Sequence, residues 1–184
     1  MKHFFAWLAT AATLTFTLPA MPSQTDPGLD RLFDALRQAS DESDAQAIEQ
    51  AIWRRWIVSG NVFVDQFVAL GLEAMAANAF GDALKVFDEV VKMAPDFAEG
   101  WNRRATVHYL LGNYDASAAD IAETLAREPR HFGALSGLGL VELGRGREAE
   151  ALAAFERALA VHPHLPGAKA RIQLLREKLR GRGI

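Results

Sequence analysis

The chain has no cysteine among its 184 residues, so disulfide bonds, thiolate catalysis and cysteine-ligated metal centres are excluded. It also lacks an excess of positive charge, because 20 Lys and Arg stand against 23 Asp and Glu. Proteins that bind nucleic acid neutralise phosphates with clustered cations, so this balance argues against a nucleic-acid partner. Half of the residues are hydrophobic, a composition typical of globular rather than disordered chains.

Motifs of catalysis are missing as well. The sequence contains no glycine-rich phosphate loop, no Gly-x-Ser-x-Gly elbow and no His-Glu-x-x-His zinc motif. Its carboxylates are scattered at spacings typical of solvated helix surfaces, whereas acid–base chemistry needs a pair brought together in a cleft. We therefore predict a protein that is not an enzyme and that holds no cofactor.

The longest apolar run stands at the N-terminus and has the composition of a secretory leader. Lys2 supplies a positive charge, residues 4–18 are apolar apart from threonines, and Pro19 and Ala20 follow. This run is short for a hydrocarbon layer of about 30 Å. We predict a signal peptide over residues 1–20, cleaved after Ala20, and a periplasmic mature protein. An uncleaved membrane anchor is the alternative.

A repeat with a period of 34 residues dominates the rest of the chain. The period links Pro95, Pro129 and Pro163, and it also links Gly112 with Gly146. Other columns at this offset are Phe67, Trp101 and Leu135; Ala83, Ser117 and Ala151; Phe87, Ile121 and Phe155; and Val91, Leu125 and Leu159. Agreement in so many columns predicts three copies of one structural unit.

Each copy is predicted to consist of two helices, because apolar residues recur at helical spacing on two segments. A break at Asn78, Gly112 or Gly146 separates the segments, and glycine after a helix adopts positive φ without strain. The repeated prolines cannot continue a helix and set the turn into the next copy. One helix pair cannot bury both of its apolar faces, so we expect the copies to stack as an array.

This pattern resembles the tetratricopeptide repeat family. The first copy keeps Leu70-Gly71, Phe80, Ala83, Phe87 and Pro95, and the third keeps Leu138-Gly139, Ala151, Phe155, Ala158 and Pro163. The second departs at Arg104, where Leu is usual, and at Thr124, where Ala is usual. The resemblance implies an all-α, right-handed solenoid of helix-turn-helix repeats over residues 64–97, 98–131 and 132–165.

Both flanks of the array are predicted to be helical. Residues 21–63 combine a linker with an amphipathic hairpin over 27–60, which we interpret as a cover for the front of the array and a candidate degenerate fourth copy. Residues 166–184 form a capping helix and a basic tail, with Ala168, Ile172 and Leu175 facing inward. A terminal helix with a polar outer face keeps a solenoid soluble.

The resemblance also implies where a partner binds, because the first helix of each copy lines a concave groove that holds a peptide or helix. By position the groove residues are Val68, Leu72 and Met75; Asn102, Arg103, Thr106 and Tyr109; and Gly133, Ser136 and Leu140. Arg103 and Asn102 are expected to take a carboxylate or backbone carbonyls. Leu72 and Met75 have the alternative of packing against the N-terminal hairpin.

One subtype of the family can be excluded by the same comparison. Members that hold the C-terminal carboxylate of heat-shock chaperones use Lys, Asn and Arg at five groove positions. The residues there are Val68, Leu72, Arg103, Gly133 and Gly137. None of the five matches, so the sequence does not predict a chaperone-tail receptor.

Three histidines, His131, His162 and His164, stand near two turns between copies. Two of them could ligate a transition metal, but His-x-His in a turn is more often solvated, and we expect no metal. His108 takes the position of a family tyrosine and is expected to pack in the core. All four are therefore interpreted as residues without a chemical role.

Charge is distributed unevenly between the two ends, acidic over residues 26–49 and basic over 169–182. The basic stretch could touch anionic lipid, although a solvated cap is the expected role. This asymmetry could favour head-to-tail contact between two molecules, but it is weak evidence for self-association. We predict a periplasmic scaffold or adaptor that binds a peptide or helix of an envelope partner. The alternative is a membrane-anchored assembly factor that uses an uncleaved leader and the basic tail.

Overall fold

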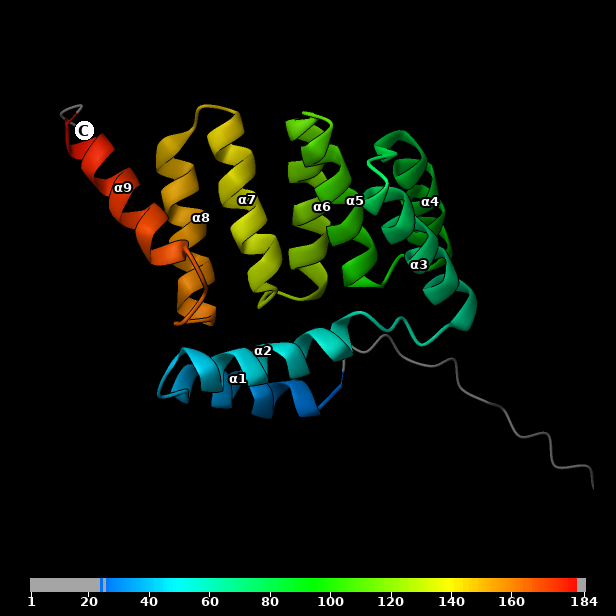
Figure 1. Cartoon of the computed structure of the whole chain (residues 1–184), viewed down its shortest axis with the longest axis horizontal. Helices are drawn as coiled ribbons and strands as arrows, with labels where there is room; N and C mark the ends of the chain where they lie inside the picture. Colours follow the sequence, from blue (N-terminus) through cyan, green and yellow to red (C-terminus); the bar gives the residue numbers. More distant parts are fainter. Residues whose placement is uncertain (1–23, 25, 182–184) are drawn as a thin grey trace, which may run out of the picture.

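The computed structural model describes residues 24 and 26–181, and within them nine α-helices and no strand are found (Figure 1). The helices are α1 Gly28–Gln38, α2 Glu42–Trp56, α3 Val62–Ala76, α4 Phe80–Met93, α5 Ala98–Leu110, α6 Tyr114–Arg127, α7 Phe132–Gly144, α8 Glu148–Val161 and α9 Ala168–Gly181. The predicted signal peptide lies outside the described residues. In the part described, none of the helices has the length and hydropathy needed to span a bilayer.

Helices α3 to α9 stand side by side as one array, in chain order (Figure 1). Three antiparallel pairs, α3–α4, α5–α6 and α7–α8, are followed by α9, which packs on α8. This arrangement confirms the predicted all-α solenoid of helix-turn-helix repeats. The first helix begins at Val62, slightly ahead of the predicted start of the first copy.

The crossing point inside each pair explains two of the repeated columns. A Cβ atom added to Gly71 would lie 2.5 Å from the ring of Phe87, and one added to Gly139 would lie 2.6 Å from the ring of Phe155. In the second pair, Ala105 stands at the glycine position and Ile121 at the phenylalanine position, and the two pack in one cluster. Isoleucine is smaller than phenylalanine. The glycine is therefore required where the facing residue is phenylalanine, and alanine suffices where it is isoleucine.

The turn inside each pair has the predicted backbone geometry. Asn78, Gly112 and Gly146 have φ angles of 57°, 76° and 73°. In the second pair the amide of Asn113 donates to the carbonyl of His108 at 2.9 Å, and the other two turns repeat this bond. Such a bond satisfies a carbonyl that the end of the helix leaves without a partner.

The two departures of the second copy from the family pattern belong to one partly buried network. The Arg104 guanidinium donates to both carboxylate oxygens of Asp120 at 2.7 and 2.8 Å, and to Asp88 at 2.9 Å. The hydroxyl of Thr124 donates to the backbone carbonyl of Asp120 at 2.9 Å. Arg104 thus joins α4, α5 and α6 by bidentate, charge-assisted hydrogen bonds in place of an apolar contact.

Helices α1 and α2 form a hairpin that lies across one end of the upright helices (Figure 1). We expected this hairpin at the front of the array, ahead of α3, and that expectation was wrong. Its buried core is shared with Phe132 at the start of α7 and with Val161 and Leu165 around the end of α8. The hairpin takes this place because its apolar face packs against the turns that precede and follow the third copy.

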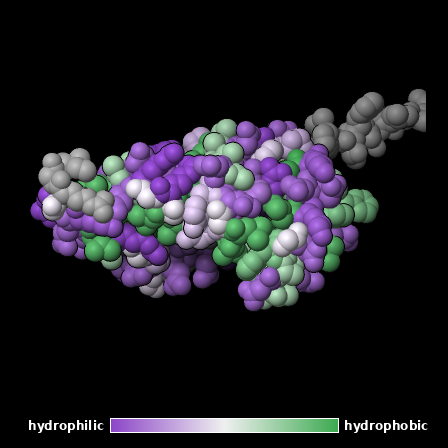
Figure 2. Space-filling model, turned by 90° about the horizontal axis from the view of Figure 1, so that it is seen from above, coloured by the Kyte–Doolittle hydropathy of each residue, from purple (hydrophilic) through white to green (hydrophobic). Residues whose placement is uncertain are grey.

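The outer face of α3 is consequently left uncovered by the hairpin. Val62, Phe63 and Leu70 are exposed there, Phe63 to 68%. Figure 2 shows apolar surface gathered at this end of the molecule. At the other end, α9 buries Ile172 and Leu175 against Ala151 and Phe155 of α8, with its basic residues outward as predicted.

Candidate functional site

A groove of about 310 Å³ lies where the hairpin meets α5 and α7. Its walls are Glu49 and Trp53 of α2; Asn102, Ala105, Thr106 and Tyr109 of α5; Ser117 and Ile121 of α6; Phe132, Gly133, Ser136, Gly137, Leu140 and Val141 of α7; and Leu165. Most of this lining is apolar or small. The two α2 residues make the hairpin one wall of the groove.

The structure brings together six of the ten groove residues that the sequence indicated. Asn102, Thr106, Tyr109, Gly133, Ser136 and Leu140 line the groove. Arg103 and the three residues of the first copy do not. Val68 is buried and Met75 packs in the same cluster, whereas Leu72 is 38% exposed outside the groove. That cluster contains no residue of α1 or α2. Val68 and Met75 therefore neither line the groove nor pack in a cluster with the hairpin.

Arg103 and Asn102 serve a buried carboxylate rather than an open surface. Glu99 is only 1% exposed, and the side-chain amide of Asn102 donates to its Oε2 at 2.8 Å. Arg103 Nε lies 2.6 Å from Glu99 Oε1. The same guanidinium lies 6.0 Å from the ring centroid of Trp53. Arg103 therefore links α5 to the hairpin, and its charge is compensated inside the protein.

His131, in the turn between the second and third copies, completes the network around Glu99. His131 Nδ1 accepts a hydrogen bond from the Ala134 amide at 3.0 Å, so the ring proton lies on Nε2, 3.0 Å from Glu99 Oε2. Burial alone would raise the pKa of Glu99, but the hydrogen bond from His131 and the charge of Arg103 hold that pKa below its ordinary value of 4.5. Glu99 is thus a buried carboxylate kept ionised by three partners.

Aromatic rings hold the hairpin against the turns. The planes of His131 and Trp56 are stacked, and Trp53 meets Phe132 edge to face with centroids 5.6 Å apart. The ring of Phe132 also meets the imidazole of His162 edge to face, with centroids 5.1 Å apart. Such geometries are the favoured arrangements of aromatic pairs. The hairpin is therefore fixed beside the groove by specific contacts as well as by apolar burial.

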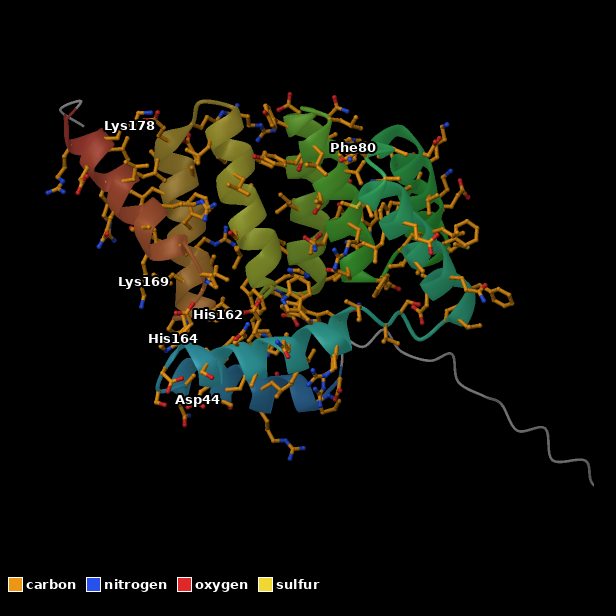
Figure 3. All side chains as sticks on the ribbon, viewed as in Figure 1. Asp44, Phe80, His162, His164, Lys169 and Lys178 are labelled. Atoms are coloured by element: carbon orange, nitrogen blue, oxygen red, sulfur yellow. The ribbon has the colours of Figure 1, made fainter. Side chains whose placement is uncertain are left out.

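The expectation that the His-x-His pair is solvated was wrong for His162. His131 and His162 are buried, because the hairpin covers the turns that carry them. Figure 3 shows His162 and His164 at the end of the array that faces the hairpin, and His164 Nε2 donates to the Ala39 carbonyl at 3.0 Å. Within the residues described, no three histidines or carboxylates are grouped so that they could hold a metal ion.

Glu49 is the ionised group at the hairpin side of the groove. Its Oε2 accepts from His162 Nε2 at 3.1 Å, and its Oε1 accepts from the indole of Trp53 at 3.2 Å. The His162 hydrogen bond lowers the pKa of Glu49 below 4.5 and outweighs the opposing effect of burial. Sequence reasoning missed Glu49 as a groove residue, because nothing in the repeat period relates α2 to α7.

A family model described as tetratricopeptide repeat matches residues 68–123 and 111–166. A tetratricopeptide repeat-containing protein of Rhizobium etli is 35% identical over 175 residues, which cover 94% of this chain and 86% of that protein.

Two solved structures share the fold at low sequence identity. The tetratricopeptide domain of Sgt2 from Aspergillus fumigatus has a TM-score of 0.63 at 19% identity, covering 67% of this chain and 83% of that one. The Yersinia enterocolitica type III secretion chaperone SycD, in complex with a peptide of the translocator YopD, has a TM-score of 0.61 at 14% identity. That match covers 64% of this chain and 95% of the chaperone.

Proposed function

The chain belongs to the tetratricopeptide repeat family, a family of non-catalytic scaffolds, and from this premise we propose that it is an adaptor of the bacterial periplasm. In this proposal it holds a peptide or helix of an envelope protein in the groove between α2, α5 and α7.

The observation that carries the proposal is the groove itself. Its volume of about 310 Å³ falls at the lower end of the range of ligand sites, and its lining is mostly apolar with a few polar groups. Gly137 lets a partner's backbone approach α7 closely, because a Cβ atom there would meet only Ile121 at 3.8 Å, whereas the same side of Gly133 is occupied by the ring of Trp53. The Yersinia chaperone of the same fold was solved with a peptide, which makes a peptide the first class of partner to test.

The periplasmic location rests on the leader sequence. Lys2, the apolar residues 4–18 and Ala20 together support export and cleavage. Amino-terminal sequencing of the protein recovered from an envelope fraction tests this part. A start near Met21 in the soluble envelope extract supports the proposal, and a start at Met1 in the membrane pellet favours the anchored alternative.

A photo-crosslinking amino acid placed at Ser136 tests the groove. Ser136 lines the groove, whereas Glu150 is exposed on α8 outside it and provides the matched control. We expect a defined partner to crosslink at position 136 and not at position 150. The same crosslink at both positions, or none at 136 when partners are abundant, contradicts the groove assignment.

Blocking the groove provides a second test of the same site. Ser136→Trp should fill the space without burying a charge, and binding of the captured partner should then fall by at least about tenfold, as expected when a central interface contact is lost. Glu150→Trp is the control for a tryptophan at an exposed position outside the groove. Unchanged binding by Ser136→Trp would place the partner elsewhere.

A further inference from the structure

We infer that the groove accepts an apolar segment carrying one basic group, and that this basic group is seated at Glu49 beside Trp53. The inference rests on the proposed function and names the chemistry of the partner. It also makes the hairpin part of the binding site, in addition to its contacts with the turns.

Charge in the groove points to a basic group. Among the residues that line it, Glu49 and Tyr109 are the ionisable ones, and no Lys or Arg is included in the described lining. Arg103, the nearby cation, is paired with the buried Glu99 and lies against the ring of Trp53. The hairpin side of the groove therefore presents a single carboxylate, Glu49, with which no Lys or Arg of the wall pairs; its titratable partner is the imidazole of His162, at 3.1 Å and outside the lining.

Glu49 is both fixed and reachable. Hydrogen bonds from His162 and from Trp53 hold one oxygen each and set the orientation of the carboxylate. Its side chain is 24% exposed in all, borders both this groove and a second hollow beside His162 and His164, and each carboxylate oxygen can accept a second hydrogen bond. An ammonium or guanidinium donor can thus pair with a carboxylate that is already oriented and partly removed from water, which strengthens the attraction.

The rest of the groove favours an apolar segment. Ile121, Leu140 and Val141 supply apolar surface, and small residues lie between them. The hydroxyl protons of Thr106 and Ser117 are already donated to the backbone carbonyls of Asn102 and Ala105. Few donors remain for a polar partner, and an acidic peptide would meet the Glu49 carboxylate with no cation of the wall to balance it.

Selection from a displayed library of random dodecapeptides tests the inference. We expect the enriched peptides that are blocked by Ser136→Trp to contain one Lys or Arg flanked by apolar residues. A synthetic copy of the best peptide should bind Glu49→Gln about tenfold more weakly than wild type, the effect of losing one charge-assisted hydrogen bond. Replacing its basic residue by norleucine should cost about the same, with no further loss in Glu49→Gln.

The controls separate loss of charge from loss of fold. Gln at position 49 keeps an acceptor for the Trp53 indole, and Glu49→Asp keeps the charge, so the preference for a basic peptide should survive in Glu49→Asp. Glu150→Gln removes a distant exposed charge and should bind like wild type. Thermal unfolding of each variant checks that the hairpin remains docked.

The outcomes distinguish the two proposals. Groove-blocked peptides that lack a basic residue, or that bind Glu49→Gln as tightly as wild type, overturn this inference and leave the proposed function standing. A library that yields no peptide blocked by Ser136→Trp contradicts the proposed function and this inference with it.

Discussion

The imidazole of His131 lies flat on the indole of Trp56, with ring centroids 4.1 Å apart and an interplanar angle of 9°. One ring belongs to the last residue of the second copy, which caps α7, and the other ends the hairpin. The same imidazole caps α7 through Ala134 and donates to Glu99. A single side chain therefore connects the hairpin, the second copy and the third copy.

Trp56→Ala should release the hairpin from the array. Trp56 is 1% exposed, and truncation of a buried tryptophan costs about 3–5 kcal/mol. Urea denaturation would measure the loss, and hydrogen exchange should accelerate over α1 and α2 before α3 to α8. The neighbouring Ile57→Ala, at a residue 44% exposed, should change stability by less than about 0.5 kcal/mol. Equal protection of α1 and α2 in both variants would contradict the latching role of Trp56.

Acid should destabilise the protein through the Glu99 and Glu49 carboxylates. Both have a folded pKa below the ordinary 4.5, so their interactions stabilise the fold above that value and are lost as the pH falls through the folded pKa. The free energy of unfolding should therefore decline below about pH 4.5.

Glu99→Gln isolates the buried part of this pH dependence. At neutral pH the variant should be less stable by about 3 kcal/mol, because it leaves Arg103 without its buried partner. Its stability should then fall less steeply with acid than that of wild type. Glu150→Gln, at an exposed position, should follow the wild-type curve. Denaturation at a series of pH values provides the measurement, and parallel curves for Glu99→Gln and wild type would exclude Glu99 as a source.

Gly71→Ala should destabilise the first helix pair by about 1–3 kcal/mol, because the new methyl group overlaps the ring of Phe87. Adding Phe87→Ile should recover part of the loss, since the second pair already combines Ala105 with Ile121. The control is Gly81→Ala, where nothing lies within 4 Å of the added Cβ. Melting temperatures of wild type, Gly71→Ala, Phe87→Ile and the double variant give the coupling, and strictly additive effects would refute steric overlap.

Arg104→Leu restores the usual family residue and should nevertheless destabilise the protein by about 3 kcal/mol. The change removes the guanidinium from the carboxylate of Asp120, whose side chain is 6% exposed, and leaves His108 Nε2 3.9 Å from it. Arg104→Leu with Asp120→Ala should be more stable than Arg104→Leu alone, because no buried charge then lacks a partner. Calorimetric unfolding distinguishes these cases, and a stable single variant would mean that Asp120 finds another partner.

The array could be predicted from the sequence because its contacts repeat with the chain. Each helix packs on its neighbours in sequence, so the columns of glycine, alanine and aromatic residues already describe the crossings. The position of the hairpin could not be predicted, because Trp53 and Trp56 contact Phe132 and His131, which lie outside the periodic columns.

The groove was predicted only in part for the same reason. Thr106, Ser136 and Leu140 follow from their place on the first helices of the copies. Arg103 was misplaced because its role depends on Glu99, four residues earlier and on the same helix face, a spacing that suits an ion pair. That spacing was visible in the sequence. The burial of Glu99 under the hairpin was not.

The hairpin is the first helical unit of the described chain to be synthesised, yet its partners come near the end. Glu49 pairs with His162 across 113 residues, and Ala39 with His164 across 125. The array, by contrast, grows through contacts between successive helices. Contacts so distant in sequence form slowly, because a long loop must close before they stabilise anything. The α1–α2 unit therefore cannot dock until the third repeat has been synthesised, and the groove, of which α2 is one wall, cannot be complete before then.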